Sequence, residues 1–506
     1  MIPLRVRTLI LLICFASALV STGAVSDAAA AEDAEARDVW YEATLGGAPM
    51  GHVHETVSVD EDGLLVTLMI SDYTMRRGHE LVVIKGSDEW RETVEGDAVS
   101  FSQTRKMAVE TQELDATVDP GRVRVRKSDG RDAVFTTVPF EGRLLFPNAI
   151  ERLHAAKGFA AGSNYSYKTF DTDFEVVADY RVTVIGPDEI EVMGQARELN
   201  KLLLESAVYE GIEVYEWRDD DGRLWREEIP ALGSVRQRAA SDVASRESEA
   251  IDMLAASTIR SNVMIPSPRA VDEAVYELWL ENGDITADIV EDGRQEVVGR
   301  TERGVLLKVR RVVPTPGTTI KFPVRSTPLK DYLDGNPMMQ TWYPILLGTA
   351  SKSVWESGQD TWQGAKQIEE WVYNTIEQKD LGTAFASARE VMERRSGDCT
   401  EHAVLMAAMT RAVGIPSKIA AGLVYHEGGF SYHMWVEVWT GEGWYALDPT
   451  MGEGSVDATH LKLAESAVPG GRIAELSLGI ARLFNRLGLR VTEYTEGGST
   501  VRAPAG

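Results

Sequence analysis

One cysteine of this chain stands where its thiol could act as a nucleophile. Cys399 follows Ser396-Gly397-Asp398 and precedes an apolar run, 403–413, that is bounded by a glycine. Asp398 fits the N-cap of a helix and Glu401 completes a capping-box pattern, so Cys399 should be the first helical residue. A helix N-terminus carries partial positive charge, which favours thiolate over thiol. We therefore expect Cys399 to have a lowered pKa, next to N–H groups that could stabilise an oxyanion.

A predicted hairpin downstream supplies two partners for this thiol. Two β-rich runs within 432–447 are joined by a glycine-containing turn, and Asp448 follows directly. If Thr440 pairs with Gly443, His433 and Asp448 share a face as diagonal neighbours, about 7 to 8 Å apart at their Cα atoms. His433 could then take the thiol proton while Asp448 holds its ring in the useful tautomer.

Each of these residues also has an ordinary interpretation. An isolated cysteine is often a buried, inert one, and His433 and Asp448 could be a strand histidine and a turn residue before a proline. Their combination after a helix-starting cysteine favours a catalytic triad. Two other histidines could compete as the base, but His402 lies three residues along the same helix and His426 lies in a glycine-rich loop. We expect supporting or surface roles for these two.

These motifs resemble those of the transglutaminase-like superfamily, a papain-related group with the catalytic order Cys, His, Asp. Four segments carry the resemblance: RSGDCTEH (395–402), AVGIPSK (412–418), HMWVEV (433–438) and GWYALDPT (443–450). It is specific over about residues 360 to 465. The resemblance implies that Cys399 is the nucleophile, His433 the base and Asp448 the third member, on a helix packed against an antiparallel sheet.

The resemblance leaves the acyl acceptor open. Thiol attack on a carboxamide gives a thioester, which an amine or water can resolve, so both protein crosslinking and hydrolysis are possible outcomes. Exported bacterial relatives are often regarded as hydrolase-like, which favours a protease or amidase acting on a protein or peptide substrate.

No cofactor or metal is expected. The chain has no acidic loop with calcium-binding spacing, and the alternating pair His52 and His54 has no obvious third ligand. Trp435 and Trp444 are expected to be packing aromatics.

A different class of function is a non-catalytic envelope-binding or scaffold protein with an inactive thiol domain. In that case the large β region would handle recognition, and Cys399 would be buried away from any cleft. The intact triad argues against this alternative.

The overall composition is that of an exported globular protein. The 506 residues are enough for two to four domains, and a net charge of −26 disfavours nucleic acid and anionic membranes as partners. Arg5 and Arg7, an apolar run from Leu9 to about Val20 and small residues to Ala31 predict a signal peptide and a periplasmic or extracellular protein. No later stretch could span a membrane. Removal of the signal leaves one cysteine, so no internal disulfide is expected. The sequence does not indicate the oligomeric state.

The elements that must position the triad follow from the periodicity of the chain. Alternating runs at 40–45, 64–70, 122–126 and 180–185 predict antiparallel strands, with a short helix at 146–156. Further strands are expected at 276–280, 285–289, 305–312 and 318–322, and helices at 362–376 and 384–392. The second group of strands could be a small sandwich-like unit or an extension of the first sheet.

We therefore expect an α+β, multidomain chain, with an N-terminal antiparallel β-rich region followed by a transglutaminase-like (papain-like) catalytic domain. The expected parts are a signal peptide (1–31), an antiparallel β-rich domain (38–235), a linker helix (236–262), a second β unit (263–328), the catalytic domain (335–468), and a C-terminal helix with a disordered tail (469–506).

Overall fold

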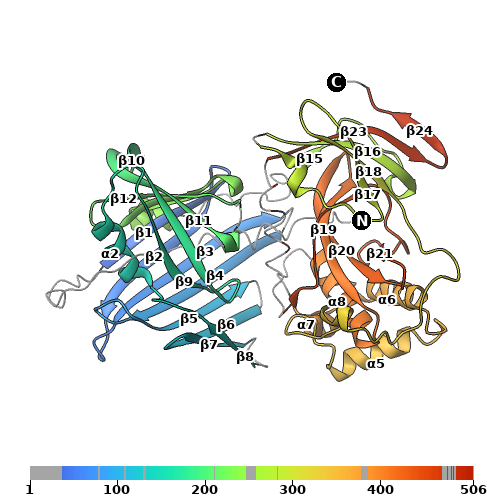
Figure 1. The fold of residues 1–506 in the computed structure, drawn as a ribbon, viewed down its shortest axis with the longest axis horizontal. Coiled ribbons are helices and arrows are strands. Elements are labelled where there is room, and N and C mark those ends of the chain that lie inside the picture. The colour runs from blue at the N-terminus through green and yellow to red at the C-terminus, as the bar shows by residue number, and fades with distance from the viewer. Residues whose placement is uncertain are drawn as a thin grey trace. The chain divides into compact units, whose positions relative to one another are not determined.

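The computed structural model describes residues 37–504, except 78–79, 108–109, 129–132, 210, 247–257, 282, 378–385, 470–475, 477–479, 481–482 and 484–485. The described residues form two compact units, one before residue 247 and one after residue 257 (Figure 1). The predicted signal peptide and most of the expected C-terminal helix lie outside the described residues. Within the described residues, no helix is both long and apolar enough to cross a membrane.

The N-terminal unit is built on one fourteen-stranded antiparallel sheet. Its strands are β1 (Arg37–Leu45), β2 (Ala48–Val59), β3 (Leu65–Arg77), β4 (Glu80–Glu92), β5 (Ala98–Met107), β6 (Glu110–Asp119), β7 (Arg122–Ser128), β8 (Ala133–Pro139), β9 (Asn164–Asp171), β10 (Val176–Val192), β11 (Gln195–Ser206), β12 (Val214–Arg218), β13 (Leu224–Ile229) and β14 (Ser234–Ala239).

The strands of this sheet form two runs, and neighbouring strands within each run are consecutive in the sequence. The chain runs outward from β1 to β8, crosses over through helix α2 (Pro147–Lys157), and returns from β9 to β14, which pairs with β1. A parallel bridge between Leu144 and Lys168 ties the crossover to β9. Helix α2 packs on β3 and β4. The N-terminal β-rich region and its short helix were therefore predicted correctly.

The C-terminal unit contains two five-stranded sheets and a group of helices. One sheet has the order β15-β20-β19-β22, with β21 added to β20, and the other has the order β17-β18-β16-β23-β24. The strands are β15 (Ile259–Arg260), β16 (Val271–Leu280), β17 (Gln295–Arg300), β18 (Val305–Arg310), β19 (Ser417–His426), β20 (Gly429–Trp439), β21 (Trp444–Leu447), β22 (His460–Ser466), β23 (Leu487–Glu496) and β24 (Ser499–Arg502).

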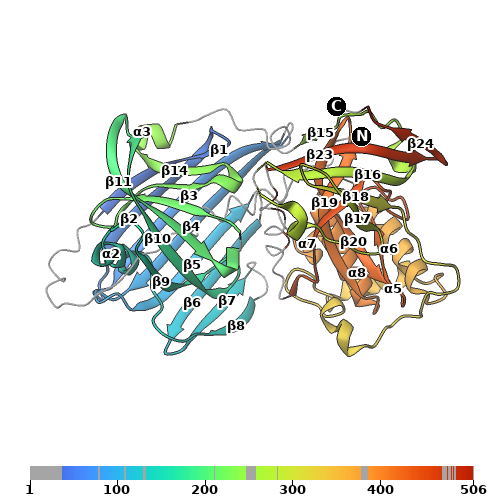
Figure 2. The same ribbon diagram turned by 45° about the horizontal axis from the view of Figure 1, so that its top comes forward.

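The helices of this unit gather around α8, which packs on β19 and β20 (Figure 2). Helices α5, α6 and α7 each pack against α8. Their bounds are α5 (Pro344–Ser353), α6 (Thr361–Thr375), α7 (Ala388–Arg394) and α8 (Cys399–Ala412). A helix carrying the cysteine thus lies on an antiparallel sheet, as the resemblance implied.

Three expected elements differ in the structure. Residues 236–239 belong to β14 and only 241–244 form a short helix, α3 (Ser241–Ala244), so the linker helix expected from residue 236 was wrong at its start. Ile285–Asp288 is a 3-10 helix and not a strand, because the Asp284 carboxylate accepts the Thr286 N–H at 2.9 Å and favours a turn. No strand forms at 318–322, where Lys321 makes a single bridge to Asp360.

The C-terminal end of the chain is also ordered where disorder was expected. Strands β23 and β24 include residues 495–496 and 499–502, and β23 pairs with β16. The second β unit is therefore neither self-contained nor an extension of the first sheet, because strands from the end of the chain complete it.

Candidate active site

Helix α8 begins as its sequence predicts. Asp398 is the N-cap, and its carboxylate accepts the backbone N–H of Thr400 at 2.9 Å. Glu401 completes the capping box, because its Oε2 accepts the Asp398 N–H at 3.1 Å. Cys399 is the first helical residue and is buried, with 2% of its surface exposed. The thiol therefore lies at the positive end of the helix dipole.

The capping box also limits which N–H groups can contact a substrate. The Asp398 carboxylate accepts the N–H groups of both Thr400 and Glu401. These two N–H groups already donate to the cap. We therefore do not include them among the donors of the expected oxyanion hole.

The turn before Cys399 depends on a glycine. Gly397 has φ +146°, and a Cβ there would lie 2.4 Å from the Cβ of Glu401. Glu401 must approach this closely because its two carboxylate oxygens accept the N–H groups of Asp398 and Ala386. Glycine therefore lets the Glu401 carboxylate fasten the loop that carries the cysteine.

The hairpin that follows adopts the predicted register. Val436 pairs with Leu447, Trp439 pairs with Trp444, and the Thr440 N–H donates to the Gly443 carbonyl at 3.1 Å. His433 and Asp448 consequently meet, with Nε2 of the ring 2.8 Å from Oδ2 of the carboxylate. Both side chains are at least 98% buried.

Helix α8 lies against the strand that carries His433. The hydroxyl of Thr400, the residue after Cys399, contacts the sulfur of Met434, the residue after His433, at 3.7 Å. The start of the helix and the middle of β20 are therefore neighbours. The structure brings the three predicted residues into one region of the C-terminal unit.

The two ring nitrogens of His433 have different surroundings. Nε2 contacts Asp448, whereas Nδ1 is buried and has no hydrogen-bond partner among the described residues. An ionised Asp448 can only accept, so it selects the tautomer with the proton on Nε2 and leaves the Nδ1 lone pair for another proton.

The Asp448 carboxyl is held in its ionised form. Burial alone would raise its pKa, but the imidazoles of His433 and His460 outweigh burial and hold the pKa well below its usual range. Its second oxygen accepts the Thr450 N–H at 2.8 Å. Both oxygens are therefore engaged.

The sequence analysis missed a second histidine at this carboxylate. His460 Nε2 lies 3.3 Å from the same Asp448 oxygen, and its Nδ1 makes an ion-pair contact of 3.2 Å with Asp457. Arg269 in turn donates to Asp457 at 2.7 Å. The available signal was weak, since only the three-residue spacing of Asp457 and His460 before a β-rich run pointed to them.

A buried glutamate on α6 lies close to the same group. Glu369 is 2% exposed and accepts the Gly454 N–H at 3.2 Å. Burial, together with the negative charge of Asp448, raises the pKa of Glu369 to about 8. Glu369 is therefore mostly protonated at neutral pH and adds little negative charge beside Asp448.

The remaining histidines and tryptophans have the expected supporting roles. His402 Nδ1 lies 2.6 Å from the Asp398 carbonyl oxygen and supports the helix start, while His426 is part-exposed beside Glu427. Trp435 is fully buried in a core cluster, and Trp444 packs against Trp439.

Two clusters of ligand-type side chains occur among the described residues. Ligand atoms of His433, Asp448 and His460 lie within 4.8 Å of one another. Because one Asp448 oxygen already contacts both rings, we assign no metal there. The second cluster makes ion pairs with the ammonium groups of Lys462 and Lys418, so we assign no metal there either; its members are Asp292, Glu437 and Glu465.

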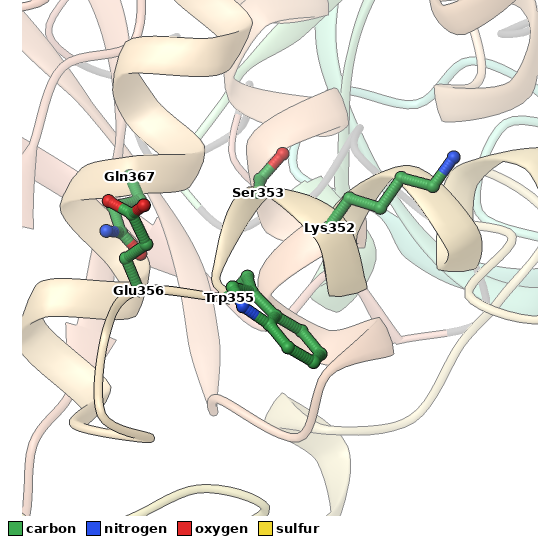
Figure 3. A pocket seen from close by; sticks show the side chains of 5 residues that line it. All are labelled: Lys352, Ser353, Trp355, Glu356 and Gln367. Atoms are coloured by element: carbon green, nitrogen blue, oxygen red, sulfur yellow. The ribbon is translucent and has the colours of Figure 1, made fainter.

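A surface pocket of about 360 Å³ lies beside α5 and α6. Figure 3 shows Trp355 between Lys352 and Ser353 on one side and Glu356 and Gln367 on the other. The Trp355 side chain is exposed. None of these five residues belongs to the predicted triad, and we assign the pocket no chemistry.

Comparison with known proteins gives a similar curated protein. A protein-glutamine gamma-glutamyltransferase from Pseudomonas aeruginosa is 38% identical over 73 residues, which cover 12% of this chain and 11% of that protein. The chain thus spans about a tenth of the length of this curated relative.

Two solved structures have lower similarity. A beta-barrel-like protein from Brucella abortus matches 40% of this chain and 95% of its own, with 13% identity and a TM-score of 0.33. The periplasmic domain of TgpA from Pseudomonas aeruginosa, bound to ethylmercury, matches 39% of this chain and 90% of its own, with 16% identity and a TM-score of 0.25.

The model of the transglutaminase-like superfamily matches residues 349–449, a segment that includes Cys399, His433 and Asp448. Through this segment, the chain carries a domain of the transglutaminase-like superfamily.

Proposed function

We propose that the protein is a thiol-dependent enzyme that transfers the acyl group of a peptide or protein carboxamide through a thioester on Cys399. In this proposal, His433 is the base and Asp448 orients it. The observation that carries the proposal is the 2.8 Å contact between Asp448 and His433 Nε2, which leaves Nδ1 for the thiol proton beside the helix that begins at Cys399.

The reaction then proceeds in two steps. Nδ1 takes the thiol proton, the sulfur attacks the carbonyl carbon, and the C–N bond breaks as the leaving amine or ammonia takes the proton from His433. In the second step, His433 removes a proton from an amine or from water, which attacks the thioester carbonyl carbon. The C–S bond breaks, and the proton passes from His433 to the sulfur of Cys399. Asp448 stays ionised and balances the imidazolium in both steps.

The similarity to a protein-glutamine gamma-glutamyltransferase supports an amine as the acceptor, and hydrolysis is the competing outcome. A glutamine-containing peptide should be incubated with the purified protein, with and without a fluorescent primary amine. Amine incorporation with release of ammonia supports acyl transfer, whereas release of ammonia with formation of glutamate supports hydrolysis. Cys399→Ala should abolish both products.

A scaffold protein with an unreactive thiol is the second candidate. It is favoured by the burial of Cys399, of which 2% is exposed. Such a protein would give neither product with any carboxamide, and its thiol would react no faster than a free cysteine.

We also propose that the protein is exported and that its catalytic domain comprises residues 335–468. The charged and apolar pattern of residues 1–31 supports export. Intact-mass measurement of the protein from an extracytoplasmic fraction should give a chain that begins after Ala31. Recovery of the full-length chain from the cytoplasm would contradict export.

A further inference from the structure

His460 is a buried titratable group that the proposed reaction does not use. Its side chain is fully buried, and each ring nitrogen contacts a carboxylate. Nε2 lies 3.3 Å from Asp448, and Nδ1 lies 3.2 Å from Asp457. Both nitrogens thus lie within ion-pair distance of a carboxylate, in the interior of the C-terminal unit.

We propose that His460 is a positioning residue of the active site, which fixes the Asp448 carboxylate by sharing it with His433 and is itself anchored by Asp457 and Arg269. This inference rests on the proposed function and adds a fourth functional side chain to the triad. Because one Asp448 oxygen contacts both rings, any movement of His460 also changes the contact that orients the base.

The anchor of this arrangement comes from a distant part of the sequence. Arg269 donates to the Asp457 carboxylate at 2.7 Å. Residues on or just before β16 and β17 then hold the backbone around His460. The Tyr276 hydroxyl donates to the Ala458 carbonyl at 2.9 Å, and Arg294 donates to the Asp457 carbonyl at 3.0 Å. The β16-containing sheet is therefore a support for the active site.

The charges around His460 are consistent with a cation at this position. Burial lowers the pKa of His460, but Asp457 and Asp448 outweigh burial and raise it above its ordinary value. The titratable and charged groups around it are Asp448, Asp457, His433, Arg269, Arg294, Glu453 and Glu369. The His460 and His433 rings lie 5.8 Å apart, measured between ring centroids.

This geometry predicts how a neutral replacement changes the thiol. Removal of a nearby positive charge makes a thiolate less stable, so Cys399 should react more slowly at a given acidic pH. In His460→Gln, the pH profile of Cys399 alkylation should shift upward by about one unit. On the acidic limb, this shift corresponds to an alkylation rate about tenfold lower.

The test is the rate of Cys399 alkylation by iodoacetamide between pH 5 and 9, measured by intact mass on the full chain. His460→Gln and Asp457→Asn should both shift the profile upward, the second because His460 loses its anionic partner. His426→Gln is the matched control, since it removes a part-exposed imidazole of the same unit, at the end of β19 beside Glu427. Thermal unfolding of each variant checks the fold.

The outcomes separate this inference from the proposed function. Fast alkylation of the wild-type protein with wild-type profiles in both variants would overturn the role of His460 and leave the triad intact. A lower rate without a shift of the profile would assign His460 a packing role only and would also overturn it. Slow alkylation of the wild-type protein would overturn both proposals. If His460→Gln does not fold, Asp457→Asn decides.

Discussion

The two units of the chain both bury charged groups, but they arrange them differently. In the N-terminal unit, two fully buried ion pairs lie along and across strands, Glu216–Arg218 at 2.7 Å and Glu227–Arg236 at 3.0 Å. In the C-terminal unit, two imidazoles converge on one oxygen of Asp448.

Two buried carboxyls, one from each unit, also respond differently to burial. Burial raises the pKa of Glu227 to about 7, despite the opposing effect of Arg236. At Asp448 the imidazoles outweigh burial and the pKa falls. Buried charge by itself therefore does not mark a reactive site, and convergence of several groups next to a nucleophile is the more informative feature.

The largest expected effect comes from replacing the shared carboxylate. Asp448→Asn can donate to Nε2 of His433 and so favours the wrong tautomer, which should slow turnover by about 10²- to 10⁴-fold. The measurement is the rate of product formation from the glutamine peptide. Asp171→Asn, the same substitution at a buried position of the N-terminal unit, should leave this rate unchanged. A rate within threefold of wild type for Asp448→Asn would show that the convergence has no catalytic role.

Breaking a pair in the N-terminal unit should affect stability and not reactivity. Glu216→Gln leaves the Arg218 guanidinium buried without its anion, which should lower the free energy of unfolding by about 3 to 5 kcal/mol. Urea unfolding followed by tryptophan fluorescence measures this change. The control Glu213→Gln, at an exposed position, should change stability by less than about 0.5 kcal/mol. Equal effects of the two variants would contradict the comparison.

The loop before Cys399 should be sensitive to one added methyl group. Gly397→Ala combines a positive φ with a contact to Glu401, and it should destabilise the C-terminal unit by about 1 to 3 kcal/mol and slow alkylation of Cys399. Gly348→Ala in α5 is the control, because nothing lies within 4 Å of the added Cβ and a helical alanine is favourable. Unchanged alkylation in Gly397→Ala would contradict a role for this turn.

The smallest effect concerns the pH dependence of the N-terminal unit. Burial and the neighbouring Asp173 raise the pKa of Asp171 to about 7. A carboxyl whose folded pKa is raised favours folding below its unfolded pKa, near 4, and this contribution is lost as the pH rises towards 7. Between pH 5 and 8, the free energy of unfolding of the wild-type protein should therefore fall by about 1 kcal/mol or more beyond the fall in Asp171→Asn. Unfolding free energies at the two pH values measure it, with Asp62→Asn at an exposed turn as control. An unchanged pH dependence would contradict the assignment.

Local interactions made the candidate site predictable. The capping box around Asp398 and Glu401 lies within four residues, and the hairpin register follows from one turn at Thr440–Gly443. Both depend on neighbouring residues, so the sequence alone was sufficient to infer that His433 and Asp448 meet.

Long-range contacts explain what the sequence analysis missed. His460 is held near Asp448 by the pairing of β22 with β19 and by Arg269, Tyr276 and Arg294, which lie more than 160 residues earlier. The start of the linker helix was misassigned for a related reason. Arg236 faces inward because Glu227 on the next strand pairs with it. A charged residue at this inward-facing position interrupts the apolar–polar alternation that would have indicated a strand.

The end of the chain was misassigned because a periodic pattern was overlooked. Leu487, Leu489 and Val491 alternate as buried residues along β23, which pairs with β16. This period of two is the ordinary signal of a half-buried strand.

The central claim is that Cys399 is an activated thiolate within a triad. Intact-mass analysis of the mature protein and of Cys399→Ala after brief exposure to iodoacetamide, at several pH values from 5.5 to 8, tests this claim most directly. The account predicts one rapid alkylation of the wild-type protein that persists to mildly acidic pH and none in the variant. A wild-type rate no higher than that of a free thiol, declining as the pH falls below 8, would contradict it.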